Sequence, residues 1–142
     1  MIGYVVGSFY RLYGACEKAV EMMKVAVNTG DDFTHLGLRI CPDLDTVMYT
    51  LAGESDISKG WGRKNESWNM LSALSAMKGE TWFQLGDKDL ATHIQRTKLI
   101  KSGNSLSEAT MKLCHSFNLP QYIFPMSDEP VETHRCNTCC VW

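Results

Sequence analysis

Three short acidic segments are the part of this chain best suited to chemistry. Each places a pair of aspartates at the junction between a loop and an expected helix: Asp31 with Asp32, Asp43 with Asp45, and Asp87 with Asp89. Magnesium takes hard oxygen ligands and usually reaches a protein through one or two carboxylates, while water and substrate phosphate complete its shell. The pattern suggests a magnesium and phosphate site, with these candidate metal ligands: Asp31, Asp32, Asp43 and Asp45.

The first two pairs also have an ordinary structural interpretation. Asp43 could be a plain helix N-cap, and Asp31 and Asp32 could belong to a turn. Asp45 is harder to explain in this way, since a cap at position 43 already serves the helix end. A carboxylate near a helix N-terminus suits holding a metal or accepting a hydrogen bond from a ligand hydroxyl.

The third pair leaves two interpretations open. Asp89 and His93 are four residues apart and therefore share a helix face. Asp87, Asp89 and His93 could form part of the site. Alternatively, Asp87 caps its own helix, and Asp89 and His93 are an ordinary surface pair.

The elements that must position these residues follow an α/β pattern. An apolar run at 2–6, helical spacing over 9–23 and a second apolar run at 24–27 predict strand, helix and strand. This unit builds a parallel sheet with a right-handed crossover. The turn at 28–32 then lies at the carboxyl end of the sheet, where open α/β proteins bind ligands.

Four further helices and a strand are expected along the chain. A helix begins at Asp43 and stops at Gly53, and a loop follows over 53–64. Asn65 can cap the next helix, whose shared face would consist of Trp68, Leu71, Leu74 and Met77. A third helix, marked by Leu90, Ala91 and Ile94, ends near Gly103. Ser105 and Glu108 form a capping box for the fourth, which buries Leu106, Ala109, Leu113 and Phe117 before a strand over 121–126.

The acidic segments occur with other short motifs that together resemble one family. The motifs are Arg39-Ile40-Cys41, Gly60-Trp61-Gly62, Asn65-Glu66-Ser67-Trp68 and Pro125-Met126-Ser127-Asp128-Glu129-Pro130. From about residue 25 to 134 the chain resembles the 2-phospho-L-lactate transferase family of coenzyme F-420 biosynthesis. The resemblance implies a Rossmann-like three-layer parallel sheet with helices on both faces, incomplete relative to the family. Residues 1–142 would form a single partial transferase domain with a divergent tail at 135–142.

The activity that the resemblance implies is a phosphoryl-group transfer. A 2-phospholactyl or phosphoenolpyruvyl group would pass from a guanosine diphospho donor to the deazaflavin FO, with release of GMP. Asp45 would contact FO and act with Asp31 in catalysis, and magnesium would be the cofactor. The resemblance also implies substrate binding by Thr46, Gln84, Asp87 and Asp89; Gln84 stands where the family often has Lys or Arg.

The chain departs from the family at its start. The segment Val6-Gly7-Ser8-Phe9-Tyr10 stands where family members have a glycine-rich phosphate loop. Two alternatives to the transferase are therefore a noncatalytic nucleotide-sugar-binding regulator of related fold and an inactive fragment.

Composition excludes several other classes of function. A net charge of -2, with 14 basic and 16 acidic side chains and no basic stripe, argues against nucleic-acid binding. The apolar run near the start is too short for a membrane span and lacks the basic flank of a signal peptide, so we expect a cytoplasmic protein, and a homodimer is possible. His134, Cys136, Cys139 and Cys140 could bind zinc, although an exposed, reducible tail is the simpler interpretation.

Overall fold

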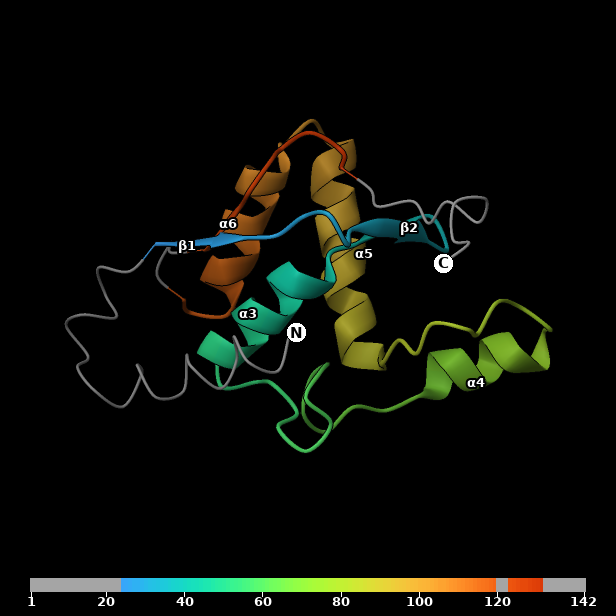
Figure 1. Cartoon of the computed structure of the whole chain (residues 1–142). Helices are drawn as coiled ribbons and strands as arrows, with labels where there is room; N and C mark the ends of the chain where they lie inside the picture. The colour runs from blue at the N-terminus through green and yellow to red at the C-terminus, as the bar shows by residue number, and fades with distance from the viewer. Residues whose placement is uncertain (1–23, 120–122, 132–142) are drawn as a thin grey trace, which may run out of the picture.

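The computed structural model describes residues 24–119 and 123–131, drawn in colour in Figure 1. In chain order the elements are β1 (Val25–Val27), β2 (Phe33–His35), β3 (Leu38–Ile40), α3 (Pro42–Leu51), α4 (Asn69–Ala76), α5 (Asp87–Lys101), α6 (Leu106–Ser116) and β4 (Ile123–Pro125). The strand expected at 2–6, the helix at 9–23 and the cysteine-rich tail lie outside the described residues.

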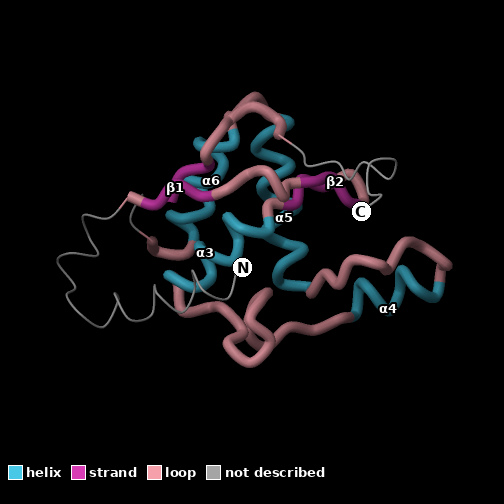
Figure 2. Tube along the Cα trace, viewed as in Figure 1, coloured by secondary structure: helices cyan, strands magenta, loops and turns pink. Residues whose placement is uncertain are grey.

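The two ends of the described chain meet in a parallel pair of strands. β1 pairs with β4 in the register Val25 to Ile123 and Val27 to Pro125. This confirms the strands expected at 24–27 and within 121–126, and it confirms the parallel arrangement. Helices α3 and α6 contact the pair, as Figure 2 shows, so the described part is an incomplete Rossmann-like α/β fold.

One hydrophobic core lies between this pair and the two helices. It joins Val27 and Ile123 from the strands to side chains of α3, α6 and the residue before α3, namely Cys41, Leu44, Met48, Tyr49, Leu106, Leu113 and Cys114. The capping box of α6 is present, because the Ser105 hydroxyl accepts from the Glu108 amide and the Glu108 carboxylate accepts from the Ser105 amide. The expected stripe of α6 is confirmed for Leu106, Ala109 and Leu113, which are buried.

The start of α3 differs from the expectation. Cys41, not Asp43, is the N-cap residue, and Pro42 occupies the first helical position. Proline fits there because that position has no intrahelical use for an N–H and needs the φ that the ring imposes. Asp43 and Asp45 therefore both lie in the first turn of the helix.

Helix α4 begins three residues later than expected. Asn65 has a left-handed φ of 55° and does not cap it, and the N-cap residue is Trp68. None of the residues of α4 is buried, and Met77 is 74% exposed. The expected face is therefore only half-buried at Trp68, Leu71 and Leu74, and Figure 1 shows α4 standing away from the other helices.

Helix α5 ends near Gly103, as expected. Its buried residues are Thr92, His93, Arg96 and Thr97, whereas Ile94 is 49% exposed. The face that α5 turns inward is therefore largely polar. No helix in the ranges 24–119 and 123–131 is long and apolar enough to cross a bilayer.

The antiparallel hairpin of β2 and β3 was not predicted from the sequence. Its turn residues, Leu36 and Gly37, have φ angles of 51° and 73°. Two successive positive φ values match the twist of a two-residue hairpin turn, but leucine is an unusual residue in that conformation. The hairpin delivers Arg39 and Cys41 to the N-terminus of α3.

Candidate active site

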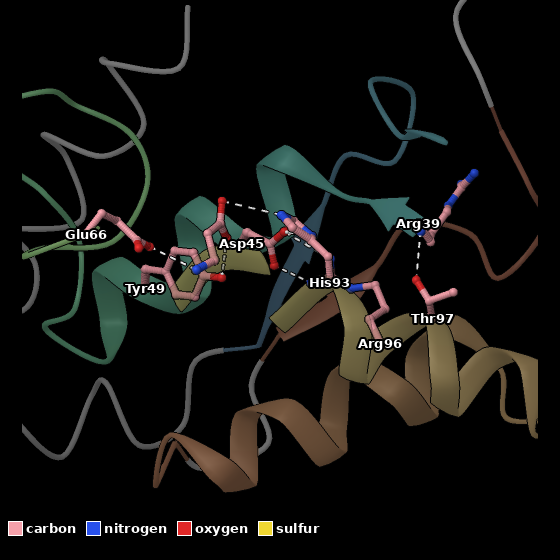
Figure 3. Close-up of polar contacts among 8 residues, drawn as sticks. Arg39, Asp45, Tyr49, Glu66, His93, Arg96 and Thr97 are labelled. Carbon is pink, nitrogen blue, oxygen red and sulfur yellow. Dashed lines mark hydrogen bonds and ion pairs between the residues drawn. The ribbon is translucent and has the colours of Figure 1, made fainter. Parts of the chain in front are cut away.

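Polar side chains from α3 and α5 meet in the interior of the protein. α3 contributes Asp45 and Tyr49, one helical turn apart, and α5 contributes Asp89, His93 and Arg96 from one face. Figure 3 shows these side chains pointing toward one another between the two helices. The polar face of α5 is thus directed at the acidic first turn of α3.

Asp45 and Arg96 form the centre of this cluster. Arg96 Nη1 donates to Asp45 Oδ2 at 3.0 Å, and Nη2 lies against Oδ1, so both carboxylate oxygens are engaged. The residues are 4% and 1% exposed. Burial by itself disfavours the charge on Arg96, but the charge of Asp45 outweighs it and the pKa of the guanidinium is raised. The pair is therefore ionic.

His93 connects this pair to Asp89. Its Nδ1 lies 3.2 Å from Arg96 Nη1 and 3.5 Å from Asp45 Oδ2, and its Nε2 lies 3.4 Å from Asp89 Oδ2. Since His93 is only 1% exposed, the interpretation of Asp89 and His93 as a surface pair is wrong. The histidine belongs to the buried cluster.

Tyr49 completes the cluster on the far side of Asp89. Its hydroxyl donates to Asp89 Oδ1 at 2.6 Å. Burial and the nearby carboxylates raise the pKa of Tyr49, so the phenol stays protonated as a donor. Burial would raise the pKa of Asp89, but the neighbouring His93 and the hydrogen bond from the Tyr49 hydroxyl lower it overall, so Asp89 is a carboxylate.

The cluster contains one group with metal-ligand geometry. Ligand atoms of Asp45, Asp89 and His93 lie within 4.8 Å of one another, the single such group among the described residues. A guanidinium already lies against both oxygens of Asp45. The positive charge beside Asp45 is therefore supplied by Arg96.

The remaining predicted metal ligands lie elsewhere around the N-terminus of α3. Asn28 Nδ2 donates to Asp43 Oδ2 at 2.9 Å and lies 3.5 Å from Asp31 Oδ2, so these two carboxylates converge on one amide. Asp32 is buried and pairs with Arg39 at 3.3 Å. Burial raises the pKa of Asp32 despite this pairing. The four predicted ligands thus divide into two residues beside Asn28, of which Asp31 is exposed and Asp43 half-buried, and two arginine-paired residues.

The third acidic segment exchanges helix caps with the segment before α4. The Asp87 carboxylate accepts from the amides of Asn69 and Met70, each at 3.0 Å, and from the Ser67 hydroxyl at 2.7 Å. Glu66 in turn accepts from the amides of Lys88 and Asp89 at 2.8 and 2.9 Å. Asp87 therefore caps α4 and Glu66 caps α5. The hydrogen bond from the Ser67 hydroxyl, followed by those from the Met70 and Asn69 amides, lowers the pKa of Asp87 to about 2.

The two other residues expected to bind substrate lie at the edges of this region. Gln84 is exposed in the loop before α5, and Thr46 is half-buried directly after Asp45. A small pocket borders Asp89 and is lined by Lys59, Trp61, Gly62, Arg63, Glu66, Trp68, Gly86 and Asp89. The Lys59 ammonium lies 4.8 Å from the centre of the Trp68 ring and 5.8 Å from that of Trp61. The two tryptophans therefore pack against a cation at the surface.

Arg96, Arg39 and Tyr49 were not predicted to belong to this region. Arg96 lies three residues after His93 and seven after Asp89, which places it on their helix face. That spacing was the one available signal. Nothing in the local sequence of Tyr49 distinguishes it from a core residue, because its polar partner lies 40 positions away.

The family resemblance is confirmed by comparison with known proteins. Residues 10–138 match the family described as 2-phospho-L-lactate transferase CofD, so the chain belongs to this family. The match includes α3, α5 and every residue of the buried cluster.

Individual relatives agree with the family match. A phosphoenolpyruvate transferase of Kitasatospora aureofaciens is 48% identical over 115 residues, which cover 80% of this chain and 36% of that protein. One from Mycolicibacterium smegmatis is 47% identical over 113 residues, covering 79% and 35%. One from Mycobacterium sp. strain KMS is 44% identical over 130 residues, covering 91% and 39%. The chain spans somewhat more than a third of the length of these relatives.

Proposed function

We propose that this chain carries the acceptor-binding part of a transferase in coenzyme F-420 biosynthesis. The transferase would move a phosphoenolpyruvyl or 2-phospholactyl group from a guanosine diphospho donor to the deazaflavin FO and release GMP. The observation that carries the proposal is the fixed, buried Asp45 carboxylate in a segment that matches the CofD family. The name of the relatives, phosphoenolpyruvate transferase, makes the enolpyruvyl donor the first to test.

The chemistry requires positioning and charge neutralisation more than covalent assistance. A hydroxyl oxygen on the side chain of FO attacks the phosphorus that bears the three-carbon acid. A phosphodiester forms, the P–O bond to the GMP phosphate breaks, and the hydroxyl proton passes to a base. We assign Asp45 to accept the hydrogen bond of the attacking hydroxyl, and Asp31 to act with it in catalysis.

Magnesium is proposed as the cofactor, and the two carboxylates beside Asn28 fit it best. Asp31, which is exposed, and Asp43, which is half-buried, converge on the neutral Asn28 amide and offer the hard oxygen ligands that magnesium takes. Asp32 and Asp45 each face a guanidinium. Their proposed role is therefore to set the electrostatic environment of Asp31 and Asp43. When bound, magnesium would neutralise the diphosphate of the donor.

The other substrate-binding assignments are proposed with different roles. Gln84 is exposed and can present its amide to FO, and Thr46 can present its hydroxyl beside Asp45. The carboxylate of Asp87 is engaged by α4 and that of Asp89 by Tyr49, so both support the site through the position of α5.

A fluorescence titration of FO into the purified full chain, with and without magnesium, tests the proposal. We expect saturable binding in the native chain and markedly weaker, still measurable binding in Asp45→Asn. Glu80→Gln, which removes a carboxylate whose side chain is 72% exposed, is the matched control and should bind as the native chain does. Absence of FO binding by a folded chain would contradict the proposal. Quenching of tryptophan fluorescence by a nucleotide sugar and not by FO would favour the regulator instead.

A further inference from the structure

Helix α5 buries an arginine and a histidine where its sequence offers apolar alternatives. Arg96 and His93 are each 1% exposed, while Ile94 on the same helix is 49% exposed. A buried charge is retained only when it is paired and hydrogen-bonded. The orientation of α5 therefore depends on what Arg96 and His93 contact, and these contacts define a task for both residues.

The contact between Arg96 and Asp45 fixes the direction of the carboxylate. Nη1 and Nη2 face Oδ2 and Oδ1 respectively, which is the two-point geometry of a planar guanidinium against a planar carboxylate. A lysine ammonium in the same place would supply the charge but would not hold both oxygens. The plane of the Asp45 carboxylate is therefore set by Arg96.

The contact between Arg96 and His93 determines which imidazole nitrogen carries the proton. A guanidinium donates hydrogen bonds and accepts none. Since Nη1 lies 3.2 Å from His93 Nδ1, the contact is a hydrogen bond when Nδ1 has its lone pair free and the proton is on Nε2. His93 Nε2 is buried, without a hydrogen-bond partner among the described residues, and 3.4 Å from Asp89 Oδ2.

We propose that Arg96 is the positioning residue of the acceptor site, because it fixes both the Asp45 carboxylate and the Nε2–H tautomer of His93. The proposal rests on the proposed function for the role of Asp45 in binding FO. Arg96 touches no substrate in this account. It acts through Asp45, whose free lone pairs it directs toward the attacking hydroxyl, and through His93, whose N–H it directs toward Asp89.

A double-mutant cycle on FO affinity tests the action through Asp45. Arg96→Lys keeps the charge and loses the two-point contact, so we expect FO binding about tenfold weaker, the equivalent of one charge-assisted hydrogen bond. In an Asp45→Asn background the same change should alter FO affinity by less than about twofold. An equal loss in both backgrounds would overturn the proposal, because a merely structural effect of Arg96 does not depend on the Asp45 carboxylate.

A second measurement is independent of FO binding. The ¹⁵N chemical shifts of the imidazole nitrogens distinguish the two neutral tautomers, and the native chain has only four histidines to assign. We expect His93 to be protonated on Nε2 at a pH where the ring is neutral, with a mixture of tautomers in Arg96→Lys. His93 protonated on Nδ1 in the native chain would overturn the proposal. If the chain failed to bind FO but His93 showed the expected tautomer, the proposed function would fail and the role of Arg96 toward His93 would stand.

Discussion

Helices α4 and α5 follow each other in the chain and place opposite kinds of side chain toward solvent. α4 carries no charged residue in Asn69–Ala76, yet none of its residues is buried. α5 is rich in charge, yet it buries His93 and Arg96 and exposes Ile94. Hydrophobicity thus orients α4 only weakly, with Met70, Leu71 and Leu74 half-buried, and it does not orient α5. Specific polar partners on α3 orient α5, and two carboxylates at the junction of α4 and α5 hold the helices together.

This junction depends on an exchange of caps. Asp87, the first residue of α5, accepts from amides at the start of α4, and Glu66, ahead of α4, accepts from amides at the start of α5. Each carboxylate satisfies amides that have no intrahelical partner. The caps fix where α5 begins, and therefore which of its side chains face Asp45.

Breaking the buried ion pair should have the largest effect on stability. Arg96→Met removes the guanidinium and leaves Asp45 buried without its partner, so we expect the free energy of unfolding to fall by about 3–5 kcal/mol. Urea denaturation of the full chain measures the change. Met77→Ser, after α4, is the contrasting variant: its side chain is 74% exposed, and a change within about 0.5 kcal/mol is expected.

A double variant separates the unpaired charge from lost packing. Arg96→Met combined with Asp45→Leu removes both charges, so it should recover most of the stability that Arg96→Met alone loses. No recovery would mean that the guanidinium stabilises the helix pair by packing, and the contrast between α4 and α5 would lose its electrostatic basis.

The range of each interaction along the chain explains which features the sequence could predict. The capping box at Ser105, the stripe of α6 and the strand at 24–27 depend on neighbouring residues, and all three were confirmed. The inward face of α5 depends on a partner of Arg96 51 positions away, and the burial of Arg96 was not predicted. Local patterns contain no information on such pairing.

The contacts at the junction of α4 and α5 could not be predicted for the same reason. Glu66 and Asp87 were singled out within motifs, but the exchange of caps between them joins residues 17 to 23 positions apart. Asp45 was singled out on the premise that Asp43 caps the helix, but the N-cap residue is Cys41 and both aspartates lie in the first turn. Its partner Arg96 was not singled out, since a helical arginine is most often a solvated surface residue.

Removing the cap of α5 should have an intermediate effect. Glu66→Ala leaves the Lys88 and Asp89 amides without their acceptor, at a cost of about 1 kcal/mol in the free energy of unfolding. Gly86→Ala should cost a similar amount, because a Cβ at Gly86 would lie 2.4 Å from Glu66 Cδ and displace the carboxylate. Urea denaturation of each single variant measures both costs.

Combining these two changes provides the control. Gly86 has φ -74°, which alanine adopts freely, so once the Glu66 side chain is gone, Gly86→Ala should cost clearly less, leaving only the preference for glycine over alanine at a helix N-cap. If Gly86→Ala were equally costly in the Glu66→Ala background, the cap would not be the reason that glycine occupies this position.

Protonation of the Asp87 carboxylate that caps α4 should have the smallest effect on stability, and it occurs only in acid. The pKa of Asp87 is lowered from 3.8 to about 2 in the folded chain, so the stability that its carboxylate contributes is complete above about pH 4 and disappears as the pH falls toward about 2. Asp87→Asn cannot ionise, so its difference in unfolding free energy from the native chain should shrink over that interval.

Amide exchange localises the effect: the Asn69 and Met70 amides should lose protection in acid. The Glu108 amide is the matched control, because the Ser105 hydroxyl that caps it does not titrate. Equal loss of protection at Glu108 would indicate general acid unfolding, and the exchange of caps would not be what distinguishes α4 from α5.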